Sequence, residues 1–263
     1  MVKIYSKFYI VFILQNLHTY KLIGVNNMKN KKEKLFIHGI ANIVIVGVLA
    51  LFAVMTLSYN AITVFGNNSY SPIYNGNRDS NKVSLMINVY WGTEYIEDIL
   101  KILKDNNITT TFFVGGQWVE KEQEMLQKIV DNGHEIGNHG YFHRDHDKLS
   151  YDQNIEEIKT CHTLVKKLTG IDMNLFAPPS GAFNKTTLDV AKELGYKTIM
   201  WSRDTIDWRD KNSDLVYKRA TNVKGGDLVL MHPTEHTLKA LPSILEYYNN
   251  NNLKVTTVSD TIL

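Results

Sequence analysis

From Val83 to the C-terminus, short apolar strands alternate with amphipathic helices, and this alternation limits the possible folds more than any other feature. Residues 83–89 and 109–116 have the composition of strands, and helices are predicted over 94–104 and 120–131. The pattern continues to the end of the chain and predicts about seven parallel strands. A compact, distorted (β/α)7-type barrel fits this length better than an open parallel sheet, although periodicity alone does not separate the two.

A second feature precedes this domain. Leu35–Leu57 is a 23-residue run without a charged residue. At about 1.5 Å per residue it is long enough to cross a bilayer core of about 30 Å. The alternative is a cleaved signal peptide, but its apolar region would be about 7–15 residues long. We therefore expect one transmembrane helix that serves as an uncleaved, single-pass anchor in the cell membrane.

Charge predicts the orientation of this anchor. Four lysines lie just before it, namely Lys29, Lys31, Lys32 and Lys34. No comparable group of lysines follows it. The positive-inside rule then places residues 1–34 in the cytoplasm and the domain outside the membrane. Residues 58–82, rich in Asn, Ser and Gly, are predicted to be a linker to a domain over 83–263. We expect translation to begin at Met28, directly before KNKKEK, so that residues 1–27 are a mis-assigned start. The net charge of +2 gives no reason to expect a nucleic-acid partner.

Polar residues follow several of the predicted strands. They are Asn88, His139, His143, Asp204, Asp207 and His232. Because the carboxyl ends of parallel barrel strands meet on one face, these side chains should become neighbours. The spacing of His139 and His143 suits a divalent metal such as Zn²⁺. His232, oriented by Asp204 or Asp207, has the features of a general acid.

Four further segments carry a resemblance to a known family, namely HEIGNHGYFH, FAPPSGAFN, WSRDTIDW and LVLMHPT. In order and spacing they resemble the polysaccharide deacetylase family, carbohydrate esterase family 4. The sporulation-associated, membrane-anchored members are the most similar in appearance. The resemblance implies a hydrolase that cleaves the amide carbon–nitrogen bond of N-acetylated sugars in cell-wall or spore glycan.

The family also implies roles for individual residues. Its zinc ion is usually held by two histidines and one aspartate, and His139 and His143 match the histidines. His232 matches the general acid, and Asp204 lies in the motif that orients this acid. Substrate-binding positions, including an aromatic residue that could stack on a sugar ring, match Trp91, Pro179, Gly181, Trp208 and Leu230.

The chain departs from the family at three positions. The position of the catalytic base is Asn88, whose amide cannot accept a proton near neutral pH. The position of the metal carboxylate is Val89, and the arginine that would pair with the base is replaced by Ala177. These changes are consistent with one another, because an arginine left without its carboxylate would be a costly buried charge.

Three interpretations follow. The chain could be an active deacetylase with a rearranged metal site, for which Glu94, Asp145 and His146 are candidate ligands. It could instead be a catalytically impaired relative that serves as an anchored glycan-binding or structural protein of the envelope. An anchored scaffold for another protein is the third interpretation.

Overall fold

The computed structural model describes residues 32, 39–40, 42–51 and 70–263. The predicted start at Met28 and both ends of the predicted anchor lie outside these residues. Residues 42–51 are helical. Within the described ranges, no helix combines the length and the apolar character needed to span a membrane. The compact domain begins at Tyr70, earlier than the predicted boundary at residue 83.

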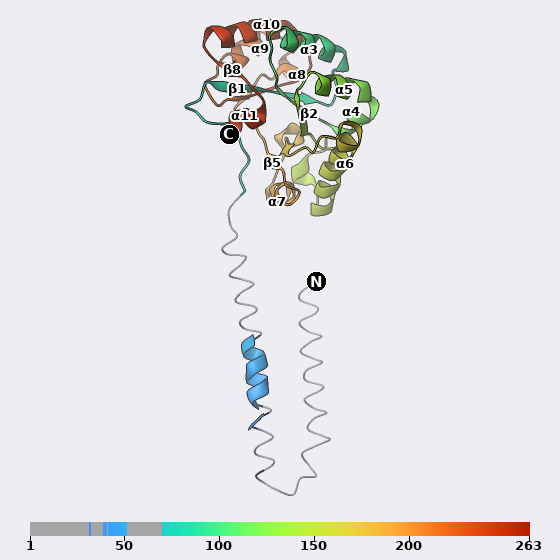
Figure 1. The fold of residues 1–263 in the computed structure, drawn as a ribbon, viewed down its shortest axis with the longest axis vertical. Helices are drawn as coiled ribbons and strands as arrows, with labels where there is room; N and C mark the ends of the chain where they lie inside the picture. The colour runs from blue at the N-terminus through green and yellow to red at the C-terminus, as the bar shows by residue number, and fades with distance from the viewer. Residues whose placement is uncertain (1–31, 33–38, 41, 52–69) are drawn as a thin grey trace. The chain divides into compact units, whose positions relative to one another are not determined.

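The domain is built on a single parallel sheet (Figure 1). Its strands follow the order β5-β4-β3-β2-β1-β7-β6, and β8 pairs with β1. Every pairing between these strands is parallel. The strands are β1 (Lys82–Val89), β2 (Thr111–Val114), β3 (Glu135–Asn138), β4 (Leu175–Phe176), β5 (Lys197–Thr198), β6 (Arg203–Asp204), β7 (Leu228–Met231) and β8 (Lys254–Val255).

The sheet is a curled half-barrel, a more open form of the distorted (β/α)7-type barrel expected from the sequence. β5 and β6 form its two edges, and no pairing joins them among the described strands. The segment 196–202 accounts for the open edge. Only Lys197–Thr198 is a strand there, and the chain then leaves the sheet before re-entering it as β6 beside β7.

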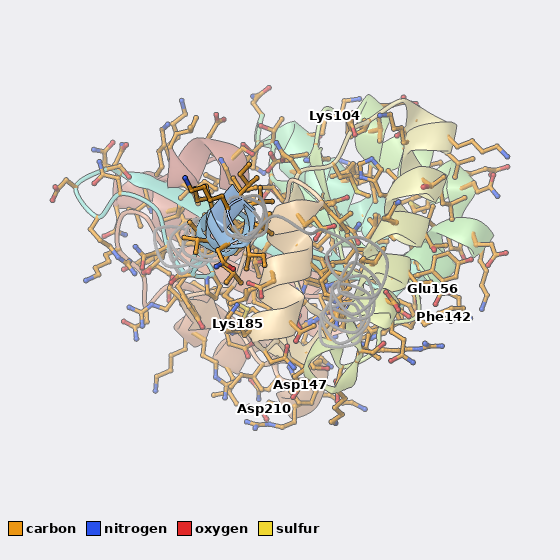
Figure 2. All side chains as sticks on the ribbon, turned by 90° about the horizontal axis from the view of Figure 1, so that it is seen from below. Lys104, Phe142, Asp147, Glu156, Lys185 and Asp210 are labelled. Atoms are coloured by element: carbon orange, nitrogen blue, oxygen red, sulfur yellow. The ribbon has the colours of Figure 1, made fainter. Side chains whose placement is uncertain are left out.

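Helices connect the strands and lie around the sheet (Figure 1). They are α3 (Ile96–Asp105), α4 (Gly116–Lys121), α5 (Gln123–Asp131), α6 (Tyr151–Thr169), α7 (Lys185–Glu193), α8 (Asp207–Asp210), α9 (Ser213–Ala220), α10 (Glu235–Asn250) and α11 (Val258–Ile262). Three 3-10 turns, η1 (Thr93–Tyr95), η2 (His146–Lys148) and η3 (Pro179–Gly181), complete the connections. Lys104, Glu156 and Lys185, labelled in Figure 2, are exposed side chains of α3, α6 and α7, so these helices turn a polar face to solvent.

Some helix boundaries are set by capping residues, and others differ from those predicted from the sequence. Ser150 and Gln153 form a capping box at the start of α6, which ends at the left-handed Gly170. The predicted helix at 120–131 is instead two helices, α4 and α5. Thr93, the first residue of η1, accepts a hydrogen bond from the Trp118 indole at 2.9 Å.

The side chains of β1 alternate between two apolar clusters. Leu85, Ile87 and Val89 belong to a large cluster shared with residues of the surrounding helices. Met86 belongs to a smaller cluster enclosed by the curled sheet, together with Phe113 of β2. This follows from the two-residue period of a strand, which sends successive side chains to opposite faces. The space enclosed by the sheet is therefore filled with side chains below its carboxyl edge.

The end of the predicted linker is part of the domain. Ile73 forms a bridge with Ile199 beyond β5, and Asn75 forms a bridge with Asp227 just before β7. The segment 70–81, which we call the N-terminal arm, thus spans the open side of the half-barrel. Asp227 is fully buried and accepts hydrogen bonds from Arg78 of the arm and from Ser202. In a closed barrel, β5 and β6 would pair directly. Here the arm instead contacts the chain beyond β5 and the chain just before β7.

Substituting Gly225 should test the arm. A Cβ at Gly225 would lie 1.7 Å from the backbone oxygen of Ser80, a contact that no side-chain rotation can relieve. We expect Gly225→Ala to lower the unfolding free energy by about 3 kcal/mol and the melting temperature by about 6–12 °C. Gly195→Ala is the control, because its new methyl meets nothing within 4 Å and carries only the strain of a positive φ. Thermal unfolding that gives equal losses for both variants would contradict the packing of the arm.

Candidate functional site

A cavity of about 400 Å³ opens at the carboxyl edge of the sheet. It brings together eight of the residues predicted from the sequence to form the site. The cavity is lined by Asn88, Tyr90, Trp91, His139, His143, Ser180, Trp201, Asp204, Trp208, Leu230 and His232. Its volume lies within the range of about 300–1,000 Å³ that is usual for small-ligand sites.

The end of β1 determines what this cavity lacks. Asn88 lines the cavity and is 4% exposed, and its Oδ1 has no hydrogen-bond partner in the described part of the chain. Val89 is fully buried in the helix-facing cluster and does not line the cavity. The sequence placed the metal carboxylate at Val89, but an aspartate in this side-chain position would face the apolar core.

The two predicted metal histidines are neighbours. Their ring centroids lie 5.0 Å apart. The Nδ1 of His139 is 2.7 Å from the carbonyl oxygen of Ala177, so Nδ1 donates and Nε2 remains available. Burial lowers the pKa of both imidazoles, well below the usual value for His139. At neutral pH the site therefore presents two uncharged imidazoles.

The loop between these histidines is held by a buried glutamate. Glu157 on α6 accepts hydrogen bonds from the backbone N–H groups of Tyr141 and Phe142, at 2.9 and 2.8 Å. Arg144 lies 3.4 Å from its other oxygen. His143 itself has a φ of 57°, in the left-handed region. Glu157 therefore stabilises a strained loop that keeps His143 beside His139.

His232 is oriented by Asp207. The Nδ1 of His232 lies 2.8 Å from Asp207 Oδ1, and the backbone N–H of His232 donates to Asp207 Oδ2 at 2.6 Å. The indole of Trp91 stacks on the imidazole with centroids 5.6 Å apart and an interplanar angle of 9°. The sequence left Asp204 and Asp207 as alternatives for the orienting role, and the family motif pointed to Asp204; the carboxylate bonded to His232 is that of Asp207.

The two aspartates have opposite electrostatic environments. Burial alone would raise the pKa of Asp207, but hydrogen bonds from His232 and from the Thr237 hydroxyl lower it below its ordinary value. Burial raises the pKa of Asp204, and its hydrogen bond from the Ile206 N–H and the nearby His232 only partly oppose this effect. Asp204 lines the cavity, whereas Asp207 lies beneath it.

Aromatic side chains form much of the cavity rim. Trp91 is 45% exposed and Trp208 is 50% exposed. Trp201 and Tyr90 also line the cavity and were not predicted; Tyr90 directly follows β1, whereas Trp201 lies in the link between β5 and β6. The predicted Pro179 and Gly181 flank Ser180, and it is Ser180 that reaches the cavity, from a left-handed conformation with φ 56°.

The donor set does not fit the zinc site implied by the family. Catalytic zinc usually takes three protein ligands. Across the described ranges, no group of three or more His, Cys, Asp or Glu side chains is arranged to hold a metal ion. None of the candidate replacements Glu94, Asp145 and His146 lines the cavity. His146 is buried and bonded to Asn154 at 2.7 Å, and Asp145 pairs with Lys148 at 2.6 Å.

Comparisons with known proteins identify the family. The polysaccharide deacetylase family model matches residues 75–199. The crystal structure of a CE4 family pseudoenzyme from Bacillus anthracis is 35% identical, with a TM-score of 0.72 over 74% of this chain and 70% of that chain. This chain belongs to the polysaccharide deacetylase family. A mutant of the same pseudoenzyme is described as having restored enzymatic activity.

Two curated relatives in the family come from Bacillus subtilis. The uncharacterized protein YlxY is 37% identical over 190 residues, which cover 72% of this chain and 60% of YlxY. The peptidoglycan-N-acetylmuramic acid deacetylase PdaA is 34% identical over 144 residues, 54% of this chain and 55% of PdaA. The chain thus spans little more than half the length of these two proteins.

Substitution of the two aspartates should have opposite effects on stability. A carboxyl with a lowered folded pKa stabilises the fold above its unfolded pKa, and this contribution is lost as the pH falls through the folded value. Asp207→Asn should therefore reduce the unfolding free energy by about 2 kcal/mol at pH 7, with a smaller loss near pH 3. Asp204→Asn removes a carboxyl with a raised pKa, so it should leave stability at pH 7 unchanged or higher.

Urea unfolding at pH 7, 5 and 3 measures both effects. The two variants are matched in chemistry and lie three residues apart, so each serves as the control for the other. A loss for Asp204→Asn as large as that for Asp207→Asn would contradict the opposite pKa shifts.

Proposed function

We propose that this protein is a catalytically impaired polysaccharide deacetylase relative that binds N-acetylated cell-wall glycan. The carrying observation is the end of β1, where the cavity meets the amide of Asn88 instead of a carboxylate and Val89 faces the core. Family membership accounts for the deacetylase-like architecture, and the altered side chains account for the proposed loss of hydrolysis.

The chemical reason is the absence of a general base. An amide has no basic lone pair near neutral pH, and loss of a general base typically costs about 10²–10⁴-fold in rate. Asp204 is the carboxylate that lines the cavity, with a hydrogen bond from the Ile206 N–H at 2.8 Å. The His232–Asp207 pair can still supply a proton donor, but a donor without a base does not activate water.

The retained features support binding. The cavity keeps three tryptophans and one tyrosine, and exposed aromatic faces are suited to stacking against the apolar faces of sugar rings. The similarity to a structure named a CE4 family pseudoenzyme adds support, because it shows that loss of activity occurs within the family. Peptidoglycan is the glycan we propose, since the relative PdaA is named for acting on it.

An acetate-release assay tests this proposal. The purified protein is incubated with the β-1,4-linked tetramer of N-acetylglucosamine. Its rate of acetate release should be at least about 10²-fold lower than the rate of a PdaA-type deacetylase acting on its own substrate. Added Zn²⁺ should not raise the rate, because two histidines alone form a poor catalytic site. Zinc-dependent acetate release that is abolished by His139→Ala would overturn the proposed impairment.

We also propose that the domain is attached to the outer side of the cell membrane through residues 35–57, as in sporulation-associated members of the family. The support is the uncharged run preceded by four lysines. Fractionation of cells expressing the full chain should recover it in membranes, and added protease should cleave the domain in intact protoplasts. Recovery as free protein, or protection from protease, would contradict this topology.

A further inference from the structure

Asn88 differs from the other buried asparagines of the domain. The side-chain amide of Asn138 donates to the Ile158 carbonyl oxygen, and its Oδ1 accepts from the Gly140 N–H. Asn154 is similarly bonded to His146 and to backbone carbonyls. Asn88 is also buried, but its Oδ1 has no partner among the described residues. An unsatisfied buried polar atom costs about 1–3 kcal/mol, so Asn88 is not explained by stability.

The surroundings of Asn88 indicate what its carboxamide could contact. Met86 pairs with Leu230 and Ile87 pairs with Met231, so the same register places Asn88 beside His232, which directly follows β7. Leu230 and Trp208 add apolar walls to the same cavity. Because Oδ1 is the enclosed end of the carboxamide, Nδ2 is the end that remains for the cavity. The cavity thus combines one amide donor with an apolar wall.

The geometry points to Asn88 as the residue that recognises the acetamido group of an N-acetylated sugar, with Nδ2 donating a hydrogen bond to the acetyl oxygen. The acetyl methyl group then lies against Leu230 and Trp208. This inference rests on the proposed glycan-binding function and adds to it a specificity-determining contact. An asparagine at this position removes the catalytic base but provides a hydrogen-bond donor. The site that hydrolyses the acetamido group in active relatives would then bind this group without cleaving it.

Chemistry explains why the amide suits this role and a carboxylate does not. An ionised aspartate can only accept hydrogen bonds, so it would face the acetyl oxygen with like charge. A de-N-acetylated sugar carries an ammonium group and offers no acceptor to Nδ2. Asp204 is the competing feature, because its carboxylate in the same cavity would attract an ammonium group. Tighter binding of the N-acetylated sugar would therefore indicate recognition by Asn88, and tighter binding of the de-N-acetylated sugar would indicate recognition by Asp204.

Titration calorimetry with the purified full-length chain tests the inference. The probes are the β-1,4-linked tetramer of N-acetylglucosamine and the same tetramer after complete de-N-acetylation. The acetylated tetramer should bind at least about tenfold more tightly. Asn88→Asp and Asn88→Leu should each weaken its binding by about three- to tenfold, the value of one hydrogen bond. Asn249→Asp, at an exposed position on α10, is the matched control and should bind like the wild type.

Stability measurements make the variants interpretable. Leucine is close to asparagine in size and removes the unsatisfied Oδ1, so Asn88→Leu should keep or raise the melting temperature. Unchanged binding in both Asn88 variants would overturn the inference while leaving the proposed function intact. Tighter binding of the de-N-acetylated tetramer by the wild type would also overturn it. Failure of the wild type to bind either tetramer would instead contradict the proposed function, and this inference with it.

Discussion

The parallel pairing of β1 with β2 and β7 is the constraint on which the rest of the structure depends. It fixes the register of a strand that is buried from Val83 to Val89. With the register fixed, the two-residue period sends Asn88 into the cavity and Val89 into the helix-facing core. A shift by one residue would exchange the two faces and expose the apolar side chains to the cavity. The chemical character of the site is therefore determined by the packing of the central strand.

Much of this arrangement could be predicted from the sequence. Asn88 and Asp204 lie at the carboxyl ends of β1 and β6, and the three histidines follow β3 and β7. A parallel sheet brings such residues to one edge, as observed for Asn88, His139, His143, Asp204 and His232. The sequence left open which of Asp204 and Asp207 orients His232, because the two lie close together in the chain and the left-handed turn at Ile206 places Asp207 against the imidazole. The N-terminal arm was also missed, since its attachment depends on the buried Asp227 and on close backbone contacts that leave no periodic pattern.

The substitutions at the site form an electrostatically consistent set. Ala177 is fully buried in the enclosed cluster, where an arginine facing the uncharged Asn88 would be a buried charge without a partner. Asp207 is compensated by four hydrogen bonds, and burial lowers the pKa of both histidines, so that they are uncharged near neutral pH. The cavity thus lacks the base and the metal carboxylate that hydrolysis would require, while tryptophan and tyrosine side chains line it.

The central claim is that the cavity holds an N-acetylated sugar without hydrolysing it. The most direct measurement is a crystal structure of the protein after prolonged incubation with the N-acetylglucosamine tetramer and Zn²⁺. We predict an intact acetamido group in the cavity, with its methyl group against Leu230 and Trp208. A bound sugar lacking its acetyl group, with free acetate in the same solution, would contradict this account.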